Sequence, residues 1–214
     1  MKRLGLGTTI ATLITLLLTC GCARVTHDYG SVVADVGYPG TAAVAVAAHD
    51  QRPYVKSGNK QADFVGVIRG GFGNPFSLAT KSGRPLAEDM AAATVASLKN
   101  KGFTAVAVTT SPEETEKKLL AELRGSGADK LLLLTLNEWR TDTYKKVTLE
   151  YDVTLTVYDK NGNRLAEKKL DGKEYLHSDS TSNAFKISTR ESPRAFKRKL
   201  EELLNNPGVA RAVR

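Results

Sequence analysis

The two cysteines of the chain, Cys20 and Cys22, have a residue type and a spacing that could support chemistry, since only one residue separates them. Such a pair could form a disulfide or redox couple, contribute to a metal site, or mark a processing site. Two cysteines alone cannot provide the four ligands of a structural zinc site. The pair ends an apolar run, LITLLLTCGCARV at residues 13–25, and this context favours processing.

The residues before the cysteines have the layout of a secretory signal. Lys2 and Arg3 form a positive start, and an apolar stretch follows from residue 4 to residue 18. This stretch is shorter than the roughly 20 apolar residues that cross a bilayer, and it leads to small residues of the kind found at cleavage sites. We therefore predict a signal peptide at 1–21. Its removal would discard Cys20, so that no cysteine pair would remain in the mature chain.

The cysteine region resembles the lipobox of bacterial lipoproteins, in which a leucine-like residue and a small residue precede a cysteine that is acylated. Gly21 and Cys22 match the last two positions, whereas Thr19 stands where the family prefers leucine. Cys20 is the alternative lipidated residue, although Thr19 fits the position before it less well. The resemblance implies that Cys22 becomes the mature N-terminus and carries an N-acyl group, such as palmitate, and an S-diacylglycerol.

This resemblance also implies a location. Two or more acyl chains hold a protein stably on a membrane, whereas one chain holds it only marginally. The residue after Cys22 is Ala23, and the absence of an aspartate there favours the outer membrane over the inner one. We therefore expect a lipid-anchored protein of the outer membrane that faces the periplasm.

The net charge of the 214-residue chain is +8. In a cytosolic protein such a charge could indicate nucleic-acid binding. At the predicted location, anionic lipid, lipopolysaccharide or peptidoglycan is the acidic neighbour, and we expect no nucleic-acid partner. A solvated surface with surplus lysine is the simpler explanation of the charge.

The hydrophobic pattern predicts one domain at 41–214, preceded by a tether at 22–40. Strict alternation between Val147 and Val157 indicates a half-buried antiparallel strand, and Asn-Gly at 161–162 indicates a hairpin. A glycine- and proline-rich loop is expected at 70–85. Strands are predicted at 41–49, 64–70, 103–109, 129–139, 147–157 and 164–175, and helices at 85–100, at 111–125 and from Ser192 onward.

This order predicts an α+β fold with α/β-like character: a single mixed sheet with helices packed on it. The alternating strands and helices between 85 and 139 should form a parallel core, and the segment 144–175 an antiparallel hairpin. The run at 129–139 is apolar on both faces, as in a central strand.

Residues 42–158 resemble the YajG-type lipoproteins. The matching segments are VAVAAHDQRP, FVGVIRGGFGNPF and PLAEDMAAATVASLKNKGF. The resemblance implies a fold similar to the N-terminal domain of TolB and a place among families that include envelope-assembly factors. It implies no particular activity.

Candidate catalytic or metal-binding residues are few. His27, His49 and His177 are scattered without ligand spacing, so no metal site or other cofactor is expected. His49 and Asp50 could form a triad with a serine of 77–82, but the chain lacks a Gly-x-Ser-x-Gly elbow. We expect no enzymatic activity.

The segment RGGFGNPF at 69–76 is the sharpest functional candidate in the predicted domain. Its glycines could wrap an anion, but it lacks the Gly-Lys-Ser/Thr ending of a phosphate-binding loop. Phe72, Pro75 and Phe76 are apolar residues in a predicted loop, and exposed they would form a partner-binding patch.

Two further charged sets have simple explanations. We expect the acidic pair, Glu150 and Asp152, to lie on a solvated sheet face. We expect the basic run from Lys197 to Lys199 to lie on a solvated helix face, although it could touch anionic lipid heads.

The sequence thus predicts a non-enzymatic outer-membrane lipoprotein whose periplasmic domain binds another envelope component, which we expect to be a protein, in an accessory role in assembly or transport. The alternative is a module that binds a small ligand or glycan, with residues 70–84 as a lid.

Overall fold

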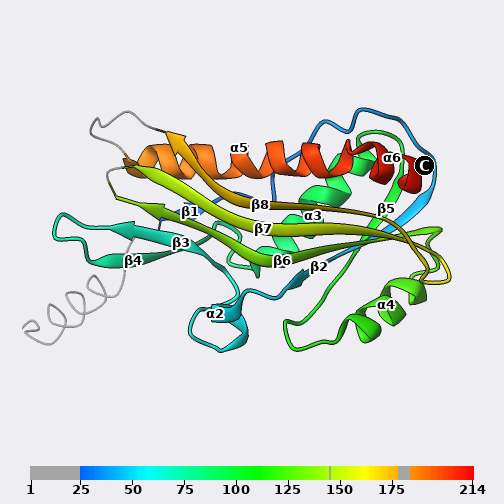
Figure 1. Cartoon of the computed structure of the whole chain (residues 1–214), viewed down its shortest axis with the longest axis horizontal. Coiled ribbons are helices and arrows are strands. Elements are labelled where there is room, and N and C mark those ends of the chain that lie inside the picture. The colour runs from blue at the N-terminus through cyan, green and yellow to red at the C-terminus, as the bar shows by residue number, and fades with distance from the viewer. Residues whose placement is uncertain (1–24, 145, 178–183) are drawn as a thin grey trace, which may run out of the picture.

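The computed structural model describes residues 25–144, 146–177 and 184–214 (Figure 1). The predicted signal peptide, Cys20 and Cys22 lie outside these residues. The strands are β1 (Thr26–His27), β2 (Ala43–Asp50), β3 (Phe64–Arg69), β4 (Pro75–Thr80), β5 (Thr104–Val108), β6 (Lys130–Thr143), β7 (Val147–Asp159) and β8 (Arg164–His177). The helices are α2 (Pro53–Lys56), α3 (Leu86–Lys99), α4 (Glu116–Gly125), α5 (Ala184–Leu204) and α6 (Pro207–Val213).

All eight strands belong to one mixed sheet, which confirms the predicted fold class. Strands β5 and β6 run parallel to each other, as predicted for the segment 85–139, and β2 lies between them, parallel to both. Strands β6, β7 and β8 form a long antiparallel meander. Strand β6 occupies the centre, because it pairs with β2, β3 and β7.

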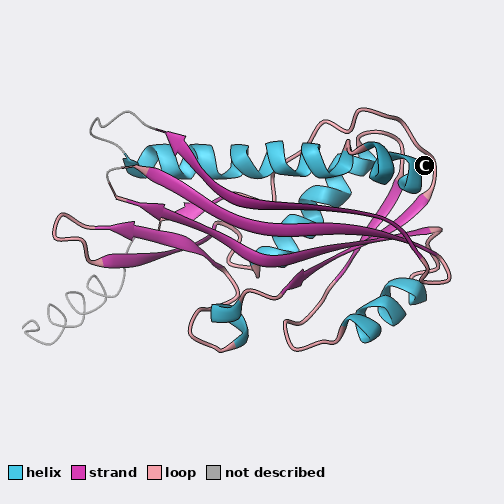
Figure 2. Cartoon of the chain, viewed as in Figure 1, coloured by secondary structure: helices cyan, strands magenta, loops and turns pink. Residues whose placement is uncertain are grey.

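One face of the sheet carries the main core under α3, α5 and α6, and Figure 2 shows α5 lying along the meander. The alternation predicted for β7 is confirmed, since Val147, Leu149, Val153, Leu155 and Val157 are buried. On the opposite face α4 covers a smaller apolar cluster, which includes Leu119, Leu123, Leu131 and Leu133. Helix α4 leaves the rest of the β6–β8 part of that face uncovered, and the residues there are largely polar.

The segment 25–40 is packed on the domain, which corrects the predicted tether. Tyr29 and Val36 are fully buried in the main core. The amide of Ala34 donates to the hydroxyl of Ser97 in α3 at 2.8 Å, and the hydroxyl of Tyr38 donates to the carbonyl of Leu204 at 3.1 Å. Glycine and proline content suggested a linker, but the apolar side chains between the glycines are buried against α3 and α5.

Two helix starts differ from the prediction. Helix α4 begins at Glu116, because the Thr115 hydroxyl accepts from the backbone of Lys118 and caps it there, after a turn at the predicted start. Helix α5 begins at Ala184 and contains Pro193 in its interior. Proline is most common in the first turn of a helix, so Pro193 led to a predicted helix start at Ser192. The helix in fact begins before that residue and continues through the proline.

Four elements were not predicted, namely β1, β4, α2 and α6. Strand β4 lies within the predicted loop at 70–85 and pairs antiparallel with β3.

Lys199 was expected to be solvated, but its ammonium lies 4.3 Å from the centre of the Tyr151 ring and 3.0 Å from a carboxylate oxygen of Glu174.

Candidate binding surface at one end of the sheet

One row of paired residues marks an end of the sheet. Phe76 of β4 pairs with Ile68 of β3, which pairs with Thr143 of β6. Thr143 pairs with Val147 of β7, and Val147 pairs with His177 of β8. The β3–β4 turn and the β6–β7 turn therefore project from the same end, which lies at the left of Figure 1. We call it the aromatic end.

Exposed aromatic side chains gather at this end. Phe72 is 99% exposed, and Tyr175 and Phe76 are 66% and 61% exposed. Tyr144 follows Thr143, and Tyr175 pairs with Thr148 one row inward. Phe185 lies one helical turn before Ser188, whose hydroxyl accepts from Thr143 at 3.0 Å. The set is Phe72, Phe76, Tyr144, Tyr175 and Phe185.

The other large exposed apolar side chains among the described residues are aliphatic and lie elsewhere: Val33, Val106 and Leu165. Val106 pairs with Ala45, in the row that continues through Leu131 and Tyr158. Leu165 adjoins that row in β8. Leu131 and Thr143 are twelve residues apart in β6, so this opposite end is about 40 Å from the aromatic end.

The hairpin that carries Phe72 and Phe76 is attached to the sheet by specific contacts. Gly73 has a φ of +82° and donates to the carbonyl of Gly70, which closes the turn. The guanidinium of Arg69 binds the Asp142 carboxylate of β6 at 2.6 Å. Phe72 thus lies in the turn, whereas Pro75 and Phe76, predicted in the same loop, begin β4 and are also exposed.

A buried polar network supports the aromatic end from beneath. The His27 ring lies 3.1 Å from the Ser188 hydroxyl and 3.4 Å from that of Tyr29. The Trp139 indole donates to the Tyr29 hydroxyl at 3.1 Å. Burial lowers the pKa of His27 to about 4 and raises that of Tyr29. The histidine is therefore neutral at neutral pH and joins β1 to α5.

The triad considered for His49 and Asp50 does not form. Successive strand residues point to opposite faces, and both carboxylate oxygens of Asp50 accept from Arg52, at 2.8 and 2.6 Å. The hydroxyl of Ser77 accepts from Lys60, and that of Ser82 donates to Asp89.

The Arg52–Asp50 pair is structural. Arg52 is fully buried and also donates to the backbone carbonyls of Phe64 and Trp139, at 2.6 and 3.3 Å. It thereby joins the C-terminal end of β2 to β3 and β6. Burial lowers the pKa of the neighbouring His49.

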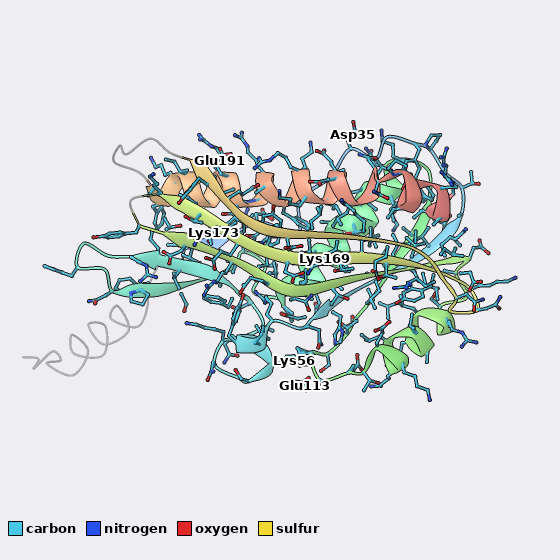
Figure 3. The ribbon with its side chains drawn as sticks, viewed as in Figure 1. Asp35, Lys56, Glu113, Lys169, Lys173 and Glu191 are labelled. Carbon is cyan, nitrogen blue, oxygen red and sulfur yellow. The ribbon has the colours of Figure 1, made fainter. Side chains whose placement is uncertain are left out.

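The polar sheet face carries paired charges. The Glu150 carboxylate accepts from Arg140 at 2.5 Å and from Lys173 at 2.6 Å, and Asp152 binds Lys169 at 3.1 Å. Figure 3 shows Lys169 and Lys173 along β8. Both carboxylates are thus paired with basic side chains. The hydrogen bonds from Lys173 and Arg140 lower the pKa of Glu150.

A hollow of about 500 Å³ lies between α4 and the polar sheet face. In it the Tyr158 hydroxyl donates to Glu116 at 2.8 Å, and Arg164 donates to Glu167 at 3.0 Å. Its remaining lining residues are Leu133, Thr135, Thr154 and Thr156. Across the described ranges, no group of three or more potential metal ligands is found, and no helix is long and apolar enough to cross a membrane.

Comparison with known proteins identifies the fold. No family model matches the sequence, and no curated protein matches it. The chain is similar in structure to a Xanthomonas campestris protein described by the family DUF330, with a TM-score of 0.50 and 12% identity over 81% of this chain and 88% of that one. The two share their fold.

Two further solved structures are more distant. The PelC dodecamer from Paraburkholderia phytofirmans matches with a TM-score of 0.39 and 14% identity, over 81% of this chain and 92% of that one. Lipoprotein GNA1162 from Neisseria meningitidis matches with a TM-score of 0.29 and 14% identity, over 75% and 99%. The resemblance to YajG-type lipoproteins remains a prediction from the sequence.

Proposed function

We propose that this protein is a non-enzymatic lipoprotein of the outer membrane, anchored through lipid on Cys22, whose periplasmic domain binds another component of the cell envelope. The observation that carries the proposal is the aromatic end, where five exposed aromatic side chains lie at the same end of the sheet. Exposed clusters of this kind usually mark an interaction site, because their hydration is unfavourable.

The mechanism is tethering. A lipid on Cys22 confines the domain to a thin layer beside the membrane, which raises its local concentration near any component of that layer. The domain then needs only modest intrinsic affinity. This arrangement suits an accessory role in envelope assembly or transport.

A second candidate function is the binding of a small ligand or glycan in the hollow beside α4. Its polar lining, with the hydroxyls of Thr135, Thr154 and Thr156, favours a hydroxylated ligand. Its carboxylates are already engaged by Tyr158 and Arg164, and the aromatic end has no role in this function.

Mass spectrometry of the membrane-extracted protein tests the anchor. We expect an acylated N-terminus at Cys22 that is lost in Cys22→Ala and retained in Cys20→Ala. Acylation at Cys20 would move the anchor by two residues. An unmodified N-terminus, with the protein free in the periplasm, would overturn the lipoprotein proposal.

Site-specific photo-crosslinking in cells tests the binding surface. A crosslinking residue at Phe72 should capture an envelope component, and one at Leu165, exposed at the opposite end, should not. Capture at Leu165 alone would move the surface to the other end and favour the second candidate.

A further inference from the structure

We infer that the aromatic end docks on the membrane itself, so that the component it binds is an anionic lipid surface. The inference rests on the proposed lipid anchor at Cys22. It assigns the exposed aromatic side chains to the headgroup region of the same bilayer that holds the acyl chains, and it makes the β3–β4 hairpin a second point of attachment.

The first argument is the direction in which the chain joins the domain. Strand β1 runs parallel to β4, with Thr26 opposite Ala79 and His27 opposite Thr80. Because β4 runs from Pro75 at the turn towards Thr80, the chain approaches Thr26 from the side of the aromatic end. The described N-terminus therefore faces the same way as the hairpin turn.

The second argument is reach. Four residues separate Cys22 from Thr26, and a fully extended chain of that length spans at most about 14 Å. Along β4, Ala79 is also four residues from Pro75, a distance of about 13 Å. A lipid on Cys22 thus holds the hairpin turn close to the bilayer surface, and the opposite end of the sheet points into the periplasm.

The third argument is side-chain chemistry. Tyrosine is enriched at the membrane–water interface, where its apolar ring and its polar hydroxyl meet different layers, and phenylalanine is a common apolar contact of surfaces that lie in this interface. Tyr144 in the β6–β7 turn, Tyr175 in β8 and Phe185 in α5 come from different parts of the chain, yet all are exposed at the hairpin end. Such a set contacts a broad, flat surface more readily than a narrow groove.

The fourth argument is charge. The Lys146 ammonium lies 5.2 Å from the centre of the exposed Tyr175 ring, and the exposed Lys186 follows Phe185. The acidic Asp142 at this end is neutralised by Arg69. Basic residues close to an anionic bilayer add attraction to apolar contact, so the aromatic end is complementary to anionic lipid in both respects.

The test places an environment-sensitive fluorophore on Phe72→Cys in the lipidated protein, reconstituted in vesicles of phosphatidylethanolamine and phosphatidylglycerol. The matched control is Leu165→Cys, also an exposed apolar position but at the opposite end. We expect the probe at position 72 to shift to shorter wavelength and to be quenched by a lipid-borne quencher, and the probe at position 165 to do neither.

Two variations sharpen the test. Phe76→Ser in the labelled protein removes one interfacial ring, which should lower the ratio of membrane-contacting to water-exposed probe about tenfold. Vesicles of phosphatidylcholine alone should give a smaller shift, since they lack the anionic headgroup. A shift of equal size in both vesicles would overturn the requirement for anionic lipid.

The remaining outcomes separate this inference from the proposed function. A probe at position 72 that stays in water in both vesicles, on a protein shown to be acylated, overturns membrane docking and leaves the proposed function standing. A wavelength shift of the probe at position 72 that appears only when outer-membrane proteins are added assigns the aromatic end to a protein partner. This outcome likewise overturns membrane docking. A protein without lipid overturns the proposed function.

Discussion

At the level of single residues, His27 is the most consequential titratable group. Its folded-state pKa of about 4 lies below the ordinary 6.5, because burial disfavours the charged ring. The unfolded chain therefore binds more protons in this interval, and stability is lost as pH falls from 6.5 to about 4. The loss should reach roughly 3 kcal/mol of unfolding free energy.

Urea unfolding at neutral pH and near pH 4 measures this loss, with His27→Gln as the control that cannot titrate. The variant should lose less stability over the same interval than the natural protein does. An identical pH dependence in both proteins would show that other groups, such as carboxylates, cause the acid sensitivity.

The buried ion pair of Asp50 and Arg52 gives a second prediction for single residues. Arg52→Leu should lower the unfolding free energy by about 3–5 kcal/mol, because it leaves the Asp50 charge buried without a partner. The control Arg69→Leu breaks an exposed pair with Asp142 and should cost less than about 1 kcal/mol. Equal losses in the two variants, by urea unfolding, would contradict this assignment.

At the level of elements, the hairpin that carries Phe72 depends on a close approach between β3 and β6. Gly66 has a φ of +149°, and a Cβ there would lie 2.3 Å from the carbonyl oxygen of Thr141. Gly66→Ala should therefore destabilise the protein by more than about 1 kcal/mol and increase hydrogen exchange in β3 and β4. The control is Gly71→Ala, whose Cβ would meet no atom within 4 Å, and it should change neither stability nor hydrogen exchange. A Gly66→Ala protein with the stability and exchange of this control would show that the close approach of β3 to β6 is not required.

At the level of the whole molecule, the N-terminal boundary of the domain decides whether the protein folds. A chain beginning at residue 25 retains the buried Tyr29, Val32, Ala34, Val36 and Tyr38. A chain beginning at residue 41 exposes the apolar surfaces that these side chains cover, and each lost large side chain costs several kcal/mol. We expect cooperative thermal unfolding in the first chain and its loss in the second. Similar transitions in both would restore the predicted tether.

Local pattern was sufficient for the elements whose periodicity is strict. The alternation from Val147 to Val157 indicates a strand that is buried on one face, and the apolar run at 129–139 indicates a strand that is buried on both faces. Both strands could therefore be predicted before any contact was known. The parallel core followed from the alternation of strands and helices. Phe72, Pro75 and Phe76 could be identified as exposed candidates because glycine and proline surround them.

Other features depend on contacts between segments that are distant along the chain. Tyr144 and Tyr175 lie within or beside strand patterns, and Phe185 lies in a helix whose apparent start was Pro193, so nothing local grouped them with Phe72. The pairing of Ile68 with Thr143 and of Val147 with His177, together with the hydrogen bond from Thr143 to Ser188 of α5, places them at the same end. Periodicity specifies which face of an element is buried, but not which other element covers that face or where its ends lie. The tertiary register alone therefore decided that the exposed aromatic rings share one end, that Arg52 donates to the carbonyls of Phe64 and Trp139, and that residues 25–40 pack on the core.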